Sequence, residues 1–241
     1  GGHFCAGGDV KDMRDLLSSP ATAEGGEGDN SPLAGNPLAQ ANRQFGTMLS
    51  EIETAPQVVI AVLEGAVMGG GFGLACVADL VVALPSARFA LPEVTLGLTP
   101  AQIAPFVVAR LGAPRTRQLA LTGARFGAQE ALAYGLVHQC LDDEAALNEH
   151  LTQTLTTLSR CAPEARRATK QLILSATHAD RDQVLDHAAL GFAHAAREGE
   201  GMAGMMAFIT KQSPAWQQAW GAIAYGQASD EESADNEGAE S

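Results

Sequence analysis

The chain has 241 residues, of which 46% are hydrophobic, and its formal net charge is −13, with 15 Lys and Arg against 28 Asp and Glu. That length can form one large domain with a sizeable core, while the excess of carboxylates is the opposite of what a general nucleic-acid binder needs. No apolar run reaches the roughly 18 residues of a membrane-spanning helix. We therefore expect neither nucleic-acid nor membrane partners.

A polar stretch and a series of short apolar runs make up the first half of the chain. Residues 18–37 are rich in Gly, Pro, Ser and Asn, which predicts a long mobile loop. The β-branched run over 57–63 predicts a buried strand. Glycines follow it, then a short helix over 72–77. Two further strands are predicted over 79–84 and 88–91.

Helical patterns dominate the second half. Three segments are each closely followed by a glycine suited to end a helix, namely 101–111, 115–121 and 129–134. A last strand is predicted over 137–141. Nearly everything from 144 to 208 is helical in pattern, with Ala162-Pro163 marking one junction.

These elements predict an α/β fold in three parts. Residues 1–143 form the α/β core, and residues 144–226 form a helical region. The segment 227–241 is an acidic tail with six carboxylates and no large apolar side chain. Such a composition cannot bury enough surface to offset its ordering entropy, so we expect the tail to be disordered.

The cysteines and histidines give no sign of a metal. The four cysteines are far apart and include no C-x-x-C pair, and the six histidines show no H-x-x-x-H spacing. This pattern supports neither a disulfide framework nor a zinc site. We therefore expect a cytoplasmic protein with free thiols and without a metal.

Two glycine clusters are the candidate functional segments. They read Cys5-Ala6-Gly7-Gly8-Asp9 and Met68-Gly69-Gly70-Gly71-Phe72-Gly73. Glycine allows tight turns and close approach of a ligand to the backbone, and the unpaired N–H groups at a helix start favour negative charge. Each cluster is therefore a candidate anion-binding turn. The alternative is that these glycines only allow close packing.

A dinucleotide-binding site is a competing interpretation of the second cluster. A strand, a glycine-rich turn and a helix follow one another there, and Glu93 lies twenty residues after Gly73. However, the G-x-G-x-x-G/A fingerprint fails at its third glycine, where Gly71-Phe72-Gly73 leads to Cys76. Glu93 also follows Pro92 instead of ending a strand, so NAD binding is disfavoured.

The motifs taken together resemble those of the enoyl-CoA hydratase/isomerase (crotonase) family. They are HFCAGGDVKDM, APQVVIAVLEGAVMGGGFGLACVADLVVA, ARFALPEVTLGLTPAQIAPFVVARLG, LTGARFGAQEALAYGLVHQCL and EGMAGMMAFITKQSPAW, in this order. The resemblance implies a spiral of ββα units and a C-terminal helical region that forms homotrimers, usually paired into hexamers. It also implies that a first ββα unit normally precedes His3, so we expect this chain to be N-terminally incomplete.

The resemblance also assigns residues to an acyl-CoA site. Gly8 and Gly70 would donate their N–H groups to the thioester oxygen, the kind of preorganised donor pair that stabilises an enolate. Glu93 would be the general acid/base, and Ala6 and Asp9 would contact substrate. Lys211 would reach a CoA phosphate, although a solvated lysine fits its position about as well. No separate cofactor is implied, since coenzyme A is part of the substrate.

Two departures from the family pattern bear on the expected mechanism and on the expected acyl group of the substrate. Hydratases with two glutamates carry one at the position of Gly73, so here Glu93 would work alone, and we expect open room at Gly73 for a branched acyl group. The family's usual Pro-Gly-x-Gly-Gly-Thr-Gln-Arg-Leu-like stretch is replaced by Leu98 to Val108. This resembles the glutaconyl-CoA hydratase branch, which implies a branched, carboxylate-bearing substrate of the isohexenylglutaconyl-CoA or methylglutaconyl-CoA type.

Three functions remain open at this point. The first is hydration of such an enoyl-CoA. The second is isomerisation of an enoyl-CoA with Glu93 as a single proton shuttle. The third is a non-catalytic role in assembly or RNA binding, which the net charge of −13 and the retention of Glu93 with both glycine clusters disfavour.

Overall fold

The computed structural model describes residues 2–8, 32–177 and 179–218. The chain divides into two compact units, Gly1–Leu147 and Asn148–Ser241. The boundary falls inside a helix, a few residues after the predicted boundary at 143. Most of the predicted loop (18–31) and the whole predicted tail (227–241) lie outside the described residues.

The first unit contains a three-stranded parallel sheet. Its strands are β1 (Ile60–Leu63), β3 (Leu80–Ala83) and β6 (Gln139–Cys140), in the order β1-β3-β6. The sequence predicted all three strands, within 57–63, 79–84 and 137–141. β1 and β3 are apolar along their whole length, which is typical of strands in a covered parallel sheet.

A second, mixed sheet lies in the same unit. Its strands are β2 (Ala66–Met68), β4 (Arg88–Ala90) and β5 (Phe126–Gly127); β2 and β4 are parallel and β5 is antiparallel to β4. Cys5 forms an isolated parallel bridge to Val67 of β2. The sequence predicted β4 but missed β2 and β5, because strands of two or three residues carry too short a pattern.

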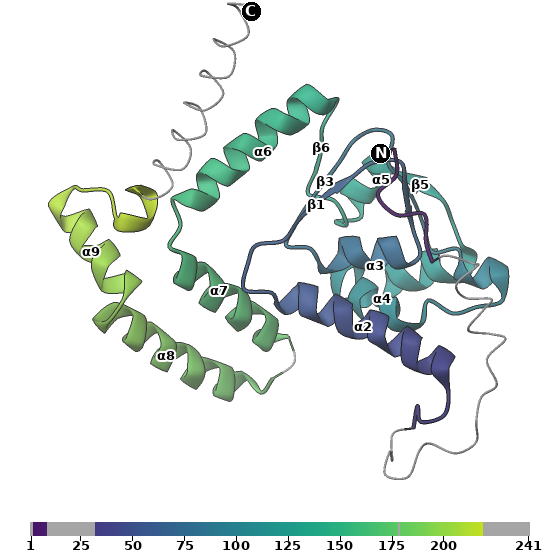
Figure 1. The fold of residues 1–241 in the computed structure, drawn as a ribbon, viewed down its shortest axis with the longest axis horizontal. Coiled ribbons are helices and arrows are strands. Elements are labelled where there is room, and N and C mark those ends of the chain that lie inside the picture. Colours follow the sequence, from purple (N-terminus) through teal and green to yellow (C-terminus); the bar gives the residue numbers. More distant parts are fainter. Residues whose placement is uncertain (1, 9–31, 178, 219–241) are drawn as a thin grey trace, which may run out of the picture. The chain divides into compact units, whose positions relative to one another are not determined.

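The strands repeat a ββα unit, as the resemblance implied. β1 and β2 lead to α3 (Gly70–Val77), and β3 and β4 lead through two 3₁₀ turns to α4 (Ala104–Thr122). In each repeat the first strand joins one sheet and the second strand joins the other. α3 packs against α4 and also against α2 (Pro37–Thr54), as Figure 1 shows.

Local sequence explains where these helices begin and end. Asn36 accepts a hydrogen bond on its side chain from the N–H of Ala39 at 3.0 Å, and Pro37 occupies the first helical position of α2. α4 is broken at Gly112, which has φ 73° and ψ 156°, and ends at Gly123 in the left-handed conformation. The two predicted helices over 101–111 and 115–121 are therefore the two halves of one kinked helix.

Three buried phenylalanines fix α3 on the mixed sheet. The ring of Phe72 meets that of Phe89 edge to face, with centroids 6.3 Å apart, and Phe89 stacks on Phe126 at 5.4 Å. Phe72 lies on α3, Phe89 on β4 and Phe126 on β5. Such pairs add to the stabilisation from burial, so the N-terminus of α3 is held rigidly above the ends of β2 and β4.

The described part of the second unit is helical, as predicted. α6 (Glu144–Ser159) leads into α7 (Pro163–Ala176), α8 (Arg181–Arg197) and α9 (Glu200–Thr210), and α8 packs against both α7 and α9. Pro163 begins α7 at the predicted junction. No helix among residues 32–177 and 179–218 is long and apolar enough to cross a membrane.

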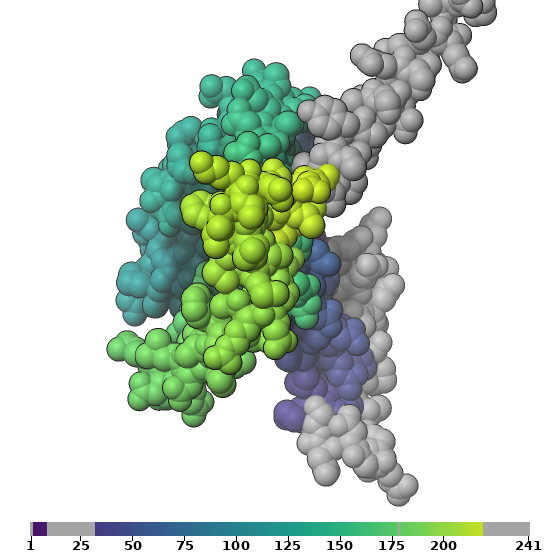
Figure 2. All heavy atoms as spheres, turned by 90° about the vertical axis from the view of Figure 1, so that its left-hand side faces the viewer, coloured from purple at the N-terminus to yellow at the C-terminus, as the bar shows by residue number. Residues whose placement is uncertain are grey.

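Large apolar side chains are exposed on the last two helices. In Figure 2, α8 and α9 (yellow-green) face the viewer with their side chains at the surface. The exposed fraction of Phe192 is 77% and that of Phe208 is 86%. The other exposed apolar residues of these helices are Leu185, Leu190, Met202, Met205, Met206 and Ile209.

Candidate active site

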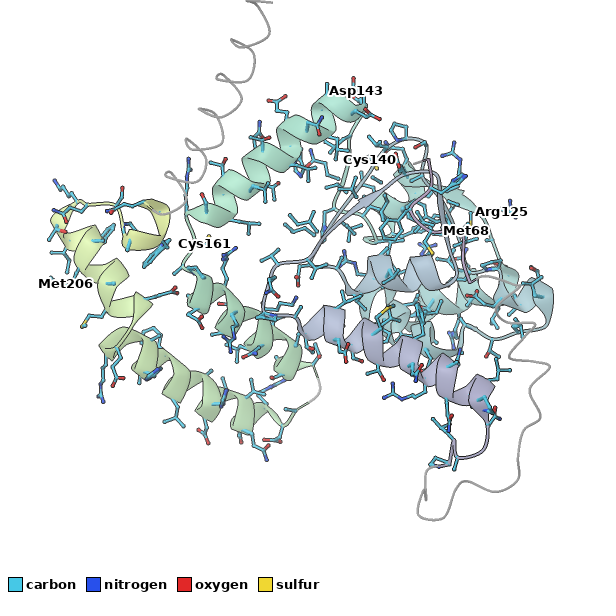
Figure 3. The ribbon with its side chains drawn as sticks, in the orientation of Figure 1. Met68, Arg125, Cys140, Asp143, Cys161 and Met206 are labelled. Carbon is cyan, nitrogen blue, oxygen red and sulfur yellow. The ribbon has the colours of Figure 1, made fainter. Side chains whose placement is uncertain are left out.

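The turn between β2 and α3 forms the base of the candidate site. Met68, labelled in Figure 3, ends β2, and Gly69 follows with φ 52°, a value that glycine adopts far more readily than other residues. Gly69 donates its N–H to the carbonyl of Ala90 at 3.1 Å. Gly70 is the first residue of α3, so its N–H has no partner within the helix. No backbone carbonyl of the described residues accepts from it either.

The N-terminal glycine cluster lies against this turn. Cys5 donates its N–H to Ala66 at 2.9 Å, and its carbonyl accepts from Met68 at 3.0 Å. Gly7 has φ 109°, and a Cβ built there would lie 3.9 Å from the carbonyl oxygen of Met68. The fold therefore brings the two predicted clusters together, with Gly8 exposed next to them in a bend.

The two clusters approach so closely that a side chain at Gly71 does not fit. A Cβ on Gly71 would lie 2.6 Å from the Cβ of Cys5 and 2.9 Å from its carbonyl oxygen. Contacts this short require a shift of the backbone. The competing interpretation of these glycines, close packing, is therefore correct for Gly71, while Gly70 keeps a free N–H toward the described residues.

Glu93 lies beside the same turn. It is the first residue of a 3₁₀ turn, η1 (Glu93–Leu96), and it is half-buried. Its Oε1 lies 3.0 Å from the position that a Cβ would take on Gly69. Its Oε2 is buried and has no hydrogen-bond partner among the residues that the structure describes. The carboxylate is thus placed at the N-terminus of α3 with one oxygen uncommitted.

Burial changes the acidity of this carboxyl group. Desolvation raises the pKa of Glu93 above its ordinary value, and a backbone hydrogen bond acts weakly in the opposite direction. A raised pKa brings the group closer to neutral pH, where a general acid/base must both take up and release a proton. Glu93 therefore combines a position beside the glycine turn with a pKa raised toward neutral pH.

The backbone around η1 holds Glu93 in place. The carbonyl of Glu93 accepts from Leu98 at 3.0 Å, and Gly97 ends the turn in the left-handed conformation. Gly123, at the end of α4, fits so tightly that a Cβ on it would lie 2.9 Å from Cγ2 of Thr95. η1 is therefore fixed between its own capping turn and the end of α4.

The expectation of open room at Gly73 is wrong. Gly73 is buried, and a Cβ built on it would collide with Cγ2 of Ile103 and lie 2.9 Å from the Cβ of Ile103. Leu49 of α2 is 3.5 Å from the same point. The space that a side chain at this position would need is filled by the 3₁₀ turn η2 (Ala101–Ile103) and by α2.

Helix α2, which the sequence did not predict, forms one side of the site. α2 places Phe45 over Gly70, with Cζ 3.1 Å from the position of a Cβ there, and its Gly46 lies under the side chain of Gln102. Phe45, Leu49 and Ile52 are spaced as one face of a helix. Together with the Asn36-Pro37 start, this spacing was the signal that could have predicted α2.

Three predicted substrate contacts remain untested by this arrangement. Ala6 is exposed within the described N-terminal segment, and Asp9 lies outside the described residues. Lys211 belongs to the second unit, where it is exposed and ends α9 with φ 56°. Its relation to Glu93 in the first unit stays a prediction.

Among the described residues, neither the buried Cys76 thiol nor a group of metal ligands competes with Glu93 at the glycine turn. Burial raises the pKa of the Cys76 thiol on α3 to about 12, although the positive charge of Arg110 acts against this. Such a thiol is protonated at neutral pH and is a poor nucleophile. Within residues 2–8, 32–177 and 179–218, no three His, Cys, Asp or Glu side chains are grouped as metal ligands.

Comparison with known proteins identifies the family. A family model described as enoyl-CoA hydratase/isomerase matches residues 1–219. The chain belongs to the enoyl-CoA hydratase/isomerase family. Among solved structures, an enoyl-CoA hydratase/isomerase from Marinobacter aquaeolei is 47% identical with a TM-score of 0.83. AtuE from Pseudomonas aeruginosa is also 47% identical, with a TM-score of 0.82. Each comparison covers 90% of this chain and 79% of the other.

Curated relatives are more distant and longer. An enoyl-CoA hydratase from Alternaria alternata is 35% identical over 135 residues, which are 56% of this chain and 45% of the relative. A carnitinyl-CoA dehydratase from Escherichia coli is 30% identical over 173 residues, 70% of this chain and 66% of the relative. The chain thus spans 45% and 66% of the lengths of these two proteins.

Proposed function

We propose that this protein is an enoyl-CoA hydratase that adds water across the double bond of an acyl-CoA thioester. The observation that carries this proposal is the half-buried carboxylate of Glu93 at the start of α3, with Oε2 uncommitted and Oε1 against Gly69. Membership of the enoyl-CoA hydratase/isomerase family supports an acyl-CoA substrate. Its relatives include proteins named as a hydratase and as a dehydratase.

The reaction needs one group that takes up a proton and gives it back. Glu93 accepts a proton from water while the water oxygen forms a bond to Cβ of the substrate, and the π bond breaks toward Cα. Negative charge gathers on the thioester oxygen, where the N–H groups of Gly8 and Gly70 stabilise it. The protonated Glu93 then delivers its proton to Cα, so one water is consumed and Glu93 returns to its starting state. Coenzyme A stays attached throughout.

The acyl group in this proposal is branched and carries its own carboxylate, of the glutaconyl type. The resemblance of GGGFGLACVADL and of the stretch 98–108 to the glutaconyl-CoA hydratase branch supports this choice. The half-buried ring of Phe45, next to Gly70 at the glycine turn, supports a hydrocarbon branch near Glu93. A second carboxylate in this half-buried region would repel both Glu93 and the charged substrate.

In this proposal the C-terminal helices form the contacts between subunits of an oligomer. The exposed apolar side chains of α8 and α9 support a homotrimer, or a hexamer of two trimers, as the resemblance implies. Exposed apolar patches of this kind are typical of protein interfaces. Lys211 at the end of α9 is exposed and available to a CoA phosphate.

Isomerisation is the second candidate function, and the absence of a carboxylate at Gly73 favours it. A single carboxylate can remove a proton from one carbon of the acyl chain and return it to another, which moves the double bond without consuming water. The same oxyanion donors would stabilise the enolate formed between the two transfers.

Mass spectrometry of the products from a panel of enoyl-CoA thioesters separates these functions. A gain of one water identifies hydration, and an unchanged mass with a moved double bond identifies isomerisation. Glu93→Gln should abolish either reaction, whereas Glu149→Gln, a matched change at an exposed carboxylate of α6, should leave it intact. Failure of the unmodified protein to convert any member of the panel would overturn the proposal.

A further inference from the structure

The two departures from the family pattern meet in space. Gly73 lacks the side chain that would bring a second carboxylate, and the unusual stretch 98–108 contains Ile103. A Cβ on Gly73 would collide with Cγ2 of Ile103 and lie 2.9 Å from its Cβ. Ile103 is only 3% exposed, so it cannot swing into solvent without opening the core. The side chain of Ile103 therefore fills the space that the missing side chain of Gly73 leaves.

The contact between Gly73 and Ile103 lies one turn of α3 away from the contact between Gly69 and Glu93. Gly73 donates its N–H to the carbonyl of Gly69 at 3.1 Å, which places the two glycines on successive turns of α3. Side chains at such a spacing begin about 5–6 Å apart. A Cβ on Gly69 would meet Oε1 of Glu93, and a Cβ on Gly73 would meet the side chain of Ile103. A carboxylate at position 73 would thus be a direct neighbour of Glu93.

We propose that Ile103 is a specificity-determining residue, an inference that rests on the proposed enoyl-CoA activity. By filling the space over Gly73, its side chain excludes a second carboxylate and keeps this side of the site apolar. Glu93 is then left as the single proton carrier, without the repulsion that a second negative charge would bring. The acyl group selected here is one that a second carboxylate at position 73 would disfavour, namely a branched chain that carries its own negative charge.

The size of residue 103 should therefore decide whether position 73 can carry a side chain. Ile103→Val keeps Cβ and Cγ2, the two contacting atoms, whereas Ile103→Ala removes Cγ2, the nearer of the two, and leaves only the contact of Cβ at 2.9 Å. Gly73→Ala should lower Tm strongly in the unmodified protein and in the Ile103→Val background. In the Ile103→Ala background the same change should cost less than about half as many degrees, because neighbouring mutations that share a contact are not additive. Equal losses of Tm in all three backgrounds would overturn the packing argument.

Activity tests the specificity itself. In Ile103→Ala, adding Gly73→Glu should raise kcat/KM for crotonyl-CoA, relative to a methyl-branched glutaconyl-CoA, by about tenfold. In Ile103→Val the same addition should leave this ratio unchanged and lower both values. A ratio that does not move in the Ile103→Ala background refutes the role of Ile103 while the proposed hydratase function stands. Absence of any turnover in the unmodified protein refutes both, and the Tm series still decides the packing.

Discussion

Replacing Glu93 by Gln removes the proton carrier of the proposed site and keeps its size. The glutamine side chain would still fit against Gly69, where Oε1 of Glu93 now lies 3.0 Å from the position of a Cβ, but it cannot take up or release a proton. Loss of general acid/base catalysis typically lowers rates by about 10² to 10⁴, which corresponds to about 3–5 kcal/mol of barrier. We expect a loss at the upper end, because position 73 offers no second carboxylate.

The loss should fall on kcat and spare substrate binding. Steady-state kinetics with an enoyl-CoA substrate measures kcat, and calorimetric titration with the saturated acyl-CoA measures affinity separately. The affinity of Glu93→Gln should stay within about threefold of the unmodified protein, because Gln keeps the size of Glu and one acceptor oxygen, while an NH₂ donor replaces the other oxygen. A variant that keeps most of its kcat would refute the single-carboxylate mechanism.

The same substitution should stabilise the folded protein at neutral pH. Burial raises the pKa of Glu93 above its ordinary value of 4.5, so the folded state holds this proton where the unfolded state has already lost it. The stability linked to this group is therefore present below pH 4.5 and is lost as pH rises through the folded-state pKa. Glu93→Gln should have the same Tm as the unmodified protein near pH 4 and a higher Tm at pH 8. A constant difference across this range would contradict the linkage.

Two further substitutions test the framework around the site. Gly71→Ala should lower the free energy of unfolding in chemical denaturation by about 1–3 kcal/mol, because its Cβ would lie 2.6 Å from the Cβ of Cys5. The control Gly191→Ala, whose Cβ would have nothing within 4 Å, should be neutral or stabilising. Asn36→Ala should cost about 0.5–2 kcal/mol through loss of the cap on α2. The exposed Asn148 of α6 caps no helix, so equal losses from Asn148→Ala would show that capping is not the cause.

Individual strands and helices could be predicted from the sequence, but the contacts between these elements could not. The buried parallel strands β1 and β3 were predicted because both of their faces are apolar. Helix ends at Gly112 and Gly123 were predicted because glycine favours the positive φ of a helix C-terminus. Both glycines have a positive φ, although Gly112 breaks α4 and only Gly123 ends it. β5 could not be predicted, since its two residues pair with β4 only through the tertiary fold.

The same limit applies to the site. Glu93 and the glycine turn were identified by resemblance, but the uncommitted Oε2 and the raised pKa depend on burial by the surrounding elements. The role assigned to Gly73 was wrong for a related reason. The contacting residue, Ile103, is thirty positions away, and nothing in the sequence says that its side chain points at Gly73.

The glycines Gly69, Gly70, Gly71 and Gly73 have four different reasons to lack a side chain. Gly69 needs a positive φ and adjoins the carboxylate, Gly70 begins the helix under the ring from α2, and the other two are covered by the N-terminal segment and by η2. Each face of the first turns of α3 is thus used by a different part of the first unit. Only at Gly71 does the close contact with the described residues include the backbone of another segment, the carbonyl oxygen of Cys5, whereas the other three glycines meet side chains. A side chain at Gly71 should therefore force the two glycine clusters apart, while the cost at the other three positions should depend on the single residue that covers each.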